Sequence, residues 1–143
     1  MMRHFILKFK SALYILYLFL IDTFVITICR KTRETSTKHR ILIVRLDAIG
    51  DFVIWQDSLK GLFELYPPEE YELTLLGNKA WSSLAKDLPY FKEVWEVDRH
   101  KFCWEIWYRI AIIKKVRKSN FSTVIQPTFS REFLLGDALI RSS

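Results

Sequence analysis

The sequence predicts an α/β domain with a Rossmann-like parallel sheet and helices on both faces, preceded by an N-terminal hydrophobic helix. From residue 41 onward, short runs rich in β-branched residues alternate with segments of helical periodicity. This alternation favours parallel strands joined by helical crossovers. A length of 143 residues suits one domain with a substantial core. The stretch before residue 30 is strongly apolar and stands apart from that pattern.

Residues 1–29 are predicted to form a hydrophobic helix that associates with a membrane. Within residues 12–29, eleven side chains are Leu, Ile, Val or Phe, and the only charge is Asp22. An Asp at the centre of a spanning helix opposes insertion by about 3 kcal/mol, so spanning is marginal. Lys8, Ser11 and Asp22 fall near one helical face, which also fits a helix lying in the membrane interface. The third interpretation of this segment is a helix packed on the domain core.

The positive charge of the chain sits on the N-terminal arm. Residues 1–40 hold eight Lys/Arg and two Asp/Glu, whereas residues 41–143 hold fourteen of each. A neutral domain behind a basic arm indicates a membrane surface and argues against a nucleic-acid partner. Residues 30–39 read as a basic linker, and more cations follow the apolar segment than precede it. The positive-inside rule then predicts a domain at the cytoplasmic face of the inner membrane.

The domain itself is predicted to cover residues 40–143. Its first strand is the run 41–44, and the helix that starts at Asp51 ends at the pair Pro67–Pro68. The later expected elements are a strand at 71–76, a helix capped by Asn78 and running to Leu88, a strand at 93–97, a helix at 102–118, a strand at 123–126 and a helix at 131–141. The four cations that close the long helix are interpreted as a solvated helix end.

The turn after the first strand carries the candidate chemistry. Ligands of open α/β sheets bind at the carboxyl ends of the strands, which is where Asp47 and Asp51 are expected. Asp51 lies where a helix begins, so the helix dipole favours its carboxylate, although a capping role explains the same placement. Arg45 ends a buried strand, and a charge there must find a partner or point into a cleft.

Several other site types fit poorly. One glycine in the turn, Gly50, is too few for a dinucleotide fingerprint or a Walker loop. A receiver domain needs an acidic pair just after the first strand; Asp98 could imitate its phosphoacceptor, but Arg45 stands where the pair should begin. Cys29 and Cys103 form neither a disulfide framework nor a metal-binding pattern.

Two stretches carry a family resemblance. The run Ile41-Leu-Ile-Val-Arg-Leu-Asp-Ala-Ile-Gly-Asp51, followed by Ser58-Leu-Lys-Gly-Leu-Phe-Glu-Leu-Tyr-Pro67, resembles the start of heptosyltransferase-type glycosyltransferases of family nine. The later run Gln126-Pro-Thr-Phe-Ser-Arg-Glu-Phe133 resembles a Pro-x-x-Ser-Arg variant of that family and differs from its Asp-x-Gln-Gly form. The resemblance covers roughly residues 40–143.

This resemblance implies a fold and a set of roles. Family members adopt the two-domain GT-B fold, in which the N-terminal domain holds the acceptor and the C-terminal domain holds the nucleotide-sugar. Transfer inverts the sugar carbon and uses no metal or other cofactor. Asp51 matches the catalytic Asp and would act as general base. The candidate acceptor-binding residues are Arg45, Asp47, Arg99, Lys101 and Arg131, and the four basic ones suit an acidic acceptor.

The expected function is therefore that of the acceptor domain of a membrane-associated glycosyltransferase in lipopolysaccharide or related surface-glycan assembly. Its expected partners are a lipid-linked glycan acceptor, a nucleotide-sugar donor and the membrane. The donor domain is expected to be absent from these 143 residues, so the chain alone is expected to be inactive. The alternative is a non-catalytic, membrane-tethered α/β binding module, with a receiver-like signalling domain as a third possibility.

Overall fold

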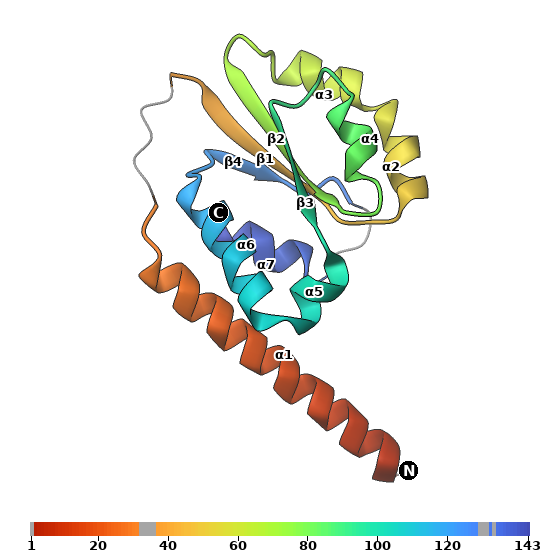
Figure 1. Cartoon of the computed structure of the whole chain (residues 1–143), viewed down its shortest axis with the longest axis vertical. Coiled ribbons are helices and arrows are strands. Elements are labelled where there is room, and N and C mark those ends of the chain that lie inside the picture. The colour runs from red at the N-terminus through yellow and green to blue at the C-terminus, as the bar shows by residue number, and fades with distance from the viewer. Residues whose placement is uncertain (1, 32–36, 129–131, 133) are drawn as a thin grey trace.

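The computed structural model describes residues 2–31, 37–128, 132 and 134–143, with side chains from residue 10 onward. Its centre is a four-stranded sheet in the order β3-β2-β1-β4, and all neighbouring strands are parallel (Figure 1). The strands are β1 (His39–Arg45), β2 (Tyr71–Asn78), β3 (Glu93–Val97) and β4 (Thr123–Ile125). The predicted α/β, Rossmann-like sheet is confirmed.

One face of the sheet is covered by α2 (Ile49–Gln56), α3 (Leu59–Leu65) and α4 (Ser82–Lys86). Alternate β1 residues, Ile41 and Ile43, point to this side, because side chains along a strand alternate between faces. They pack into one buried cluster with residues of these helices, including Phe52, Trp81 and Ala85.

The opposite face is covered by α5 (Arg99–Trp104), α6 (Ile106–Lys118) and α7 (Gly136–Ser142). Leu42 and Val44 of β1 point to this side. They share a second buried cluster with apolar residues of the helices, including Phe102, Ile113, Val116, Ala138 and Leu139. Helices therefore lie on both faces, as predicted.

Two of the long predicted helices are interrupted. The helix expected from Asp51 stops at Gln56 and restarts at Leu59, because Asp57 and Ser58 form a turn in which Ser58 N–H donates to Trp55 O. The helix expected from residue 102 begins earlier, at Arg99, and breaks at Glu105, whose backbone is extended. Its start is set by Asp98, whose carboxylate accepts a hydrogen bond from the Lys101 N–H.

The expected capping role of Asn78 is wrong. Asn78 is the last residue of β2, and α4 begins only at Ser82. Its side-chain amide donates to the carbonyls of Leu46 and Asp47 and accepts from Ala80 N–H. The residue therefore ties the end of β2 to the end of β1. The last helix likewise begins at Gly136, five residues later than predicted.

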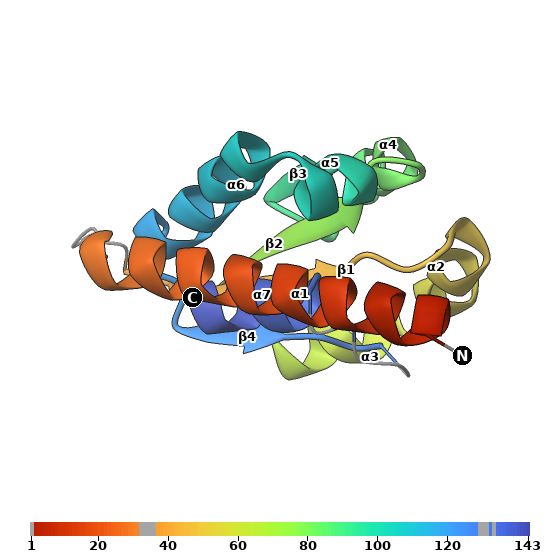
Figure 2. The ribbon, with the colours of Figure 1, turned by 90° about the horizontal axis from the view of Figure 1, so that it is seen from below.

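The N-terminal helix α1 (Met2–Ile28) lies against α6 and α7, and its N-terminal part extends away from the domain (Figures 1 and 2). Among its side chains from residue 10 onward, Leu18, Asp22 and Val25 are buried. Its segment Lys10–Ile28 is long and apolar enough to cross a membrane by length and composition, and only 17% of the most apolar window is buried. The helix is thus docked on the domain along one narrow stripe.

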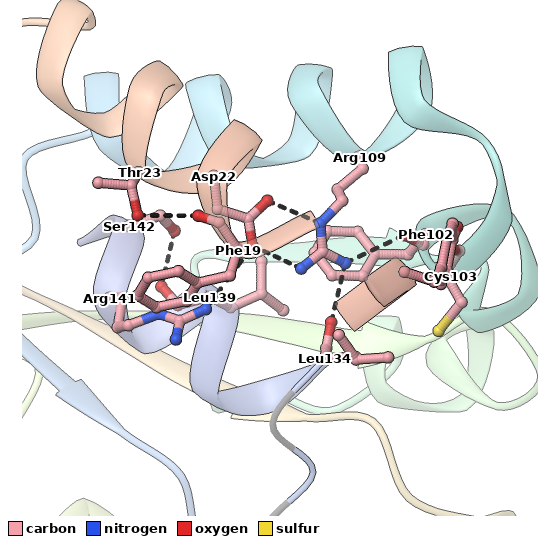
Figure 3. Close-up of polar contacts among 11 residues, drawn as sticks. Phe19, Asp22, Thr23, Phe102, Cys103, Arg109, Leu134, Leu139, Arg141 and Ser142 are labelled. Carbon is pink, nitrogen blue, oxygen red and sulfur yellow. Dashed lines mark hydrogen bonds and ion pairs between the residues drawn. The ribbon is translucent and has the colours of Figure 1, made fainter. Parts of the chain in front are cut away.

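Polar contacts fasten this stripe to the domain (Figure 3). The Asp22 carboxylate accepts hydrogen bonds from Arg109 Nε at 2.7 Å and Arg109 Nη2 at 2.6 Å. Near the other end, Arg117 donates to the carbonyls of Cys29 and Ser143. The basic end of α6 is therefore not simply solvated, because Arg117 joins the C-terminal end of α1 to Ser143 and Lys115 lies over the Trp95 ring.

Candidate functional site

A polar cavity of about 240 Å³ opens where β1 and β4 end. The chain leaves β1 toward β2 and returns to β4 on the other side of β1, so the cavity lies at the topological switch point of the sheet. Its lining consists of Arg45, Leu46, Asp47, Asp51, Gln126, Thr128, Glu132, Leu135 and Gly136. Three of the residues predicted from sequence, Arg45, Asp47 and Asp51, are thereby brought together.

The Arg45 side chain links the two segments that border this cavity. Its guanidinium lies 2.9 Å from the Asp47 carboxylate and donates to Pro127 O at 2.7 Å and to Asp51 O at 2.9 Å. The guanidinium carbon also lies 4.7 Å from the centre of the Trp55 ring. These contacts join the turn after β1 to the segment after β4. The charge at the end of the buried strand thus finds its partners within the site.

Burial shifts the titration of the Arg45–Asp47 pair. Removal from water raises the pKa of Asp47 from its ordinary value, and attraction to Arg45 opposes this rise. The same desolvation lowers the pKa of Arg45, against the opposing effect of Asp47 and Asp51. Desolvation is the larger cause for both groups, so the pair is held in a partly dry environment.

The turn that carries the acidic residues is supported from the neighbouring strand. The Asp47 carbonyl accepts hydrogen bonds from Asn78 Nδ2 at 3.1 Å and Trp81 Nε1 at 2.9 Å. The Trp81 ring is fully buried and stacks on Phe52 of α2, with ring centroids 4.1 Å apart. Asn78 and Trp81 therefore hold the turn in place before any ligand arrives.

Asp51 projects from the first turn of α2 and is exposed where it lines the cavity. The N-terminal end of a helix favours a carboxylate through its dipole and free N–H groups. An accessible carboxylate in this position can accept a proton from a hydroxyl group that enters the cavity.

Four buried polar atoms around the cavity lack a hydrogen-bond partner within the part of the chain that the structure describes. They are Arg45 Nε, Asp47 Oδ1, Gln126 Oε1 and Thr128 Oγ1. A buried polar group without a partner costs about 1–3 kcal/mol. Their concentration around one cavity identifies it as the place where a polar ligand or water can complete these bonds.

Of the other three predicted residues, Arg99, Lys101 and Arg131, the two that the structure describes do not line the cavity. Arg99 Nη2 lies 2.9 Å from Glu132 Oε1, so it reaches the cavity rim through an ion pair with a lining residue. Lys101 is an exposed residue of α5 and does not line the cavity. Arg131 lies outside the residues that the structure describes.

Besides Leu46 and Leu135, four lining residues were not predicted as site residues, namely Gln126, Thr128, Glu132 and Gly136. Gln126 packs directly on Gly136, where a Cβ atom would lie only 2.0 Å from Gln126 Nε2. Their position in the sequence could have indicated this, because three of the four closely follow the fourth strand. Placing β4 beside β1, as in a Rossmann-like sheet, would have put them opposite Asp47.

Among the described residues, no group of three or more His, Cys, Asp or Glu side chains is arranged to hold a metal ion. Comparisons of the chain with protein-family models, with curated proteins and with solved structures give no match. The functional argument therefore rests on the site.

Proposed function

We propose that this chain is the acceptor-binding domain of a membrane-associated glycosyltransferase of the heptosyltransferase type. The acceptor is a glycan of lipopolysaccharide or a related surface glycan, carried on a lipid. The sugar donor is a nucleotide-sugar bound by a second domain. The enzyme works at the cytoplasmic face of the inner membrane. The chemistry needs no cofactor from this domain.

One observation carries the proposal. The cavity at the switch point combines an accessible carboxylate, Asp51, with buried polar atoms whose hydrogen bonds are incomplete. A glycan presents many hydroxyl groups, each of which both donates and accepts a hydrogen bond. Such a ligand can satisfy the Gln126 and Thr128 side chains while placing one hydroxyl beside Asp51.

The proposed reaction consists of proton removal from the acceptor, attack on the donor sugar and departure of the nucleotide. Asp51 removes the proton from the acceptor hydroxyl, and the resulting oxygen attacks the anomeric carbon of the donor sugar. The bond from that carbon to the phosphate oxygen of the nucleotide breaks on the opposite side, so the configuration inverts. Holding acceptor and donor in line contributes about 7–11 kcal/mol toward lowering the barrier, which requires both domains together.

The basic residues that the structure describes differ in how close they lie to the cavity, and so in their proposed roles. Arg45 orients the turn through its contacts with Asp47 and Asp51, and its free Nε–H can still reach a ligand. Arg99 sits at the rim, paired with Glu132. An anionic group of the acceptor competes with Glu132 for the Arg99 guanidinium, since both are acceptors of charge-assisted hydrogen bonds. Lys101 and Arg131 remain candidates for contacts further along the acceptor.

Calorimetric titration of the full chain tests the acceptor site. The probe is a soluble core oligosaccharide prepared from deacylated lipopolysaccharide, and the comparison ligand is a nucleotide-sugar. We expect the oligosaccharide to bind and the variant Thr128→Val to weaken binding about tenfold, since it removes one hydroxyl at constant shape. Asp57→Asn, at the far end of α2, is the matched control. Binding of the nucleotide-sugar in place of the oligosaccharide would mean that the cavity is a donor site.

A non-catalytic binding module is the second candidate. It is favoured by one observation, namely that most donors of Arg45 are already engaged by groups of the chain itself. A module that binds a glycan would use the same cavity. The two candidates differ in that only the transferase requires the Asp51 carboxylate, which a turnover measurement on an Asp51 variant decides.

A further inference from the structure

The exposed side of α1 forms a continuous apolar surface with two tryptophans of the domain. We call this set the α1 surface, and its members are Leu13, Leu16, Leu20, Phe24, Ile28, Trp104 and Trp107. The α1 members recur every three or four residues, so they share one side of the helix. Trp107 is 80% exposed, an unusual state for the largest apolar side chain.

The two tryptophans are joined to α1 by packing. The Trp104 ring stacks on Tyr14 with centroids 5.2 Å apart, and the Tyr14 hydroxyl donates to Cys103 O at 2.5 Å. An apolar groove lies between α1 and α6, with Phe24 and Ile28 on one side and Trp107 on the other. Helix and domain thus present one surface.

The buried ion pair withdraws the acidic group of α1 from this surface, whereas Glu105, between the two tryptophans, is exposed. Between residues 10 and 31, Asp22 is the single acidic side chain, and Arg109 holds it inside the domain. The exposed side of α1 between Lys10 and Arg30 is therefore uncharged, and the hydroxyls of its exposed Thr23 and Thr27 donate to backbone carbonyls of the helix. Exposed cations flank the apolar segment of α1, with Lys10 at its N-terminal end and Arg30 and Lys31 just beyond its C-terminal end. Lys114 adds a further cation at the edge of the groove.

We propose that the α1 surface binds an anionic lipid bilayer with α1 lying in the plane of the membrane. This inference rests on the membrane association included in the proposed function and defines its geometry. The apolar side chains enter the acyl region, and the tryptophan rings lie at the level of the headgroups. Lys10, Arg30, Lys31 and Lys114 contact anionic lipid headgroups.

The docked position of α1 opposes a spanning arrangement. A spanning helix is surrounded by lipid or by other spanning helices, whereas α1 contacts α6 and α7 of the folded domain. Crossing the bilayer in the docked state would carry α6 into the hydrocarbon. Crossing after undocking would leave Asp22 and Arg109 as separated charges.

Flotation of the full chain with lipid vesicles tests the binding. We expect the chain to float with vesicles of phosphatidylethanolamine and phosphatidylglycerol, and to bind vesicles of phosphatidylcholine alone at least tenfold more weakly. Leu20→Lys should weaken binding at least tenfold, because it puts a charge in the centre of the surface. Leu65→Lys is the matched control, since Leu65 is also exposed but lies on α3 across the sheet. Equal loss in both variants would overturn the proposal.

Cysteine labelling tests the orientation. In a chain with Cys29→Ser and Cys103→Ser, single cysteines replace Lys10 or Lys31, which flank the apolar segment of α1. A membrane-impermeant maleimide added outside the vesicles should label both positions fully if α1 lies in the plane. Labelling of only one position would show that α1 spans, and would overturn the proposal.

Sedimentation without lipid examines the competing occupant of the surface. A dimer that Leu20→Lys disrupts, together with no vesicle binding, would assign the surface to a second copy of the chain and would overturn the proposal. Asp51→Asn should leave flotation unchanged, because Asp51 lines the cavity at the sheet edge. Failure of this inference is therefore distinguishable from failure of the proposed transferase function.

Discussion

The carboxylate of Asp22 on α1 and the guanidinium of Arg109 on α6 form a two-point ion pair, and each side chain is only 1% exposed. Arg109 Nη1 also donates to the carbonyls of Phe102 and Leu134. One arginine therefore joins α1, α5 and the segment before α7 (Figure 3). The Asp22 charge, which opposes membrane insertion of α1, is the point at which that helix is attached to the domain.

The first prediction concerns this pair. We expect Asp22→Asn to lower the free energy of unfolding by about 3–5 kcal/mol, because it leaves the Arg109 charge buried without a counter-charge. Denaturant unfolding of the full chain in mild detergent measures the loss. Glu72→Gln is the control, since it removes a partly exposed pair with Lys92 and should cost less than about 1 kcal/mol.

A double variant separates charge burial from packing. Asp22→Asn combined with Arg109→Met removes both charges, so we expect it to be more stable than Asp22→Asn alone. If Asp22→Asn costs no more than Glu72→Gln, α1 is not held to the domain by this pair.

The second prediction concerns catalysis. In an assay with the proposed two-domain transferase, Asp51→Asn should reduce turnover by about a hundredfold or more while acceptor affinity stays near that of the parent chain. The amide keeps the shape of the side chain and loses the ability to accept the proton. Asp57→Asn, also an exposed acid at an end of α2, should keep full turnover. Near-normal turnover by Asp51→Asn would leave the binding module as the better reading.

The sheet was predictable because strand signals are local. Runs such as Ile41–Val44 carry a β-branched pattern that needs no knowledge of the remaining chain. The interruptions at Asp57 and Glu105 were missed because the helical periodicity continues through both positions. Partners distant in sequence were also out of reach: Asp22 and Arg109 are 87 residues apart, and the hydrophobic pattern of α1 shows a charge without showing what neutralises it.

Part of the site was also predictable from local sequence pattern. Asp47 and Asp51 follow a strand directly, so their position at the sheet edge follows from local pattern. The contribution of Gln126 and Thr128 depends on β4 lying next to β1, a long-range feature. The internal role of Arg45 depends on the carbonyls of Pro127 and Asp51, which no spacing rule identifies.

The third prediction follows from the raised pKa of Asp47. A carboxyl group whose pKa is higher in the folded chain than in the unfolded chain binds more protons when folded, so its contribution favours folding at low pH. That contribution is lost as the pH rises from the unfolded value of about 3.9 through the folded pKa. The non-titrating variant Asp47→Asn should therefore gain stability relative to the parent chain over this interval.

Unfolding curves of both proteins from about pH 3 to pH 7 measure this difference. The quantity to compare is how the difference in free energy of unfolding changes with pH. Its absolute value is not informative, because replacing the side chain adds a constant offset at every pH. A difference that falls with rising pH would mean that attraction to Arg45 outweighs the desolvation of Asp47.

The fourth prediction concerns the support beneath the acidic turn. A Cβ atom at Gly77 would lie 2.9 Å from Trp81 Cζ3, and the Trp81 ring is fully buried against Phe52. We expect Gly77→Ala to cost about 1–3 kcal/mol, because the ring cannot move without disturbing the core. Gly61→Ala is the matched control. A Cβ there meets nothing within 4 Å, so alanine in this helix should stabilise by about 0.5–1 kcal/mol.

The same substitution also reports on the site. Trp81 Nε1 donates to the Asp47 carbonyl, so a displaced ring should loosen the turn and weaken oligosaccharide binding in the calorimetric titration. Gly61→Ala should bind like the parent chain, since Gly61 lies on α3 away from the cavity. If Gly77→Ala is destabilised but binds normally, Trp81 supports the fold without positioning Asp47. If both alanine variants behave alike, the close contact between Gly77 and Trp81 does not constrain the turn.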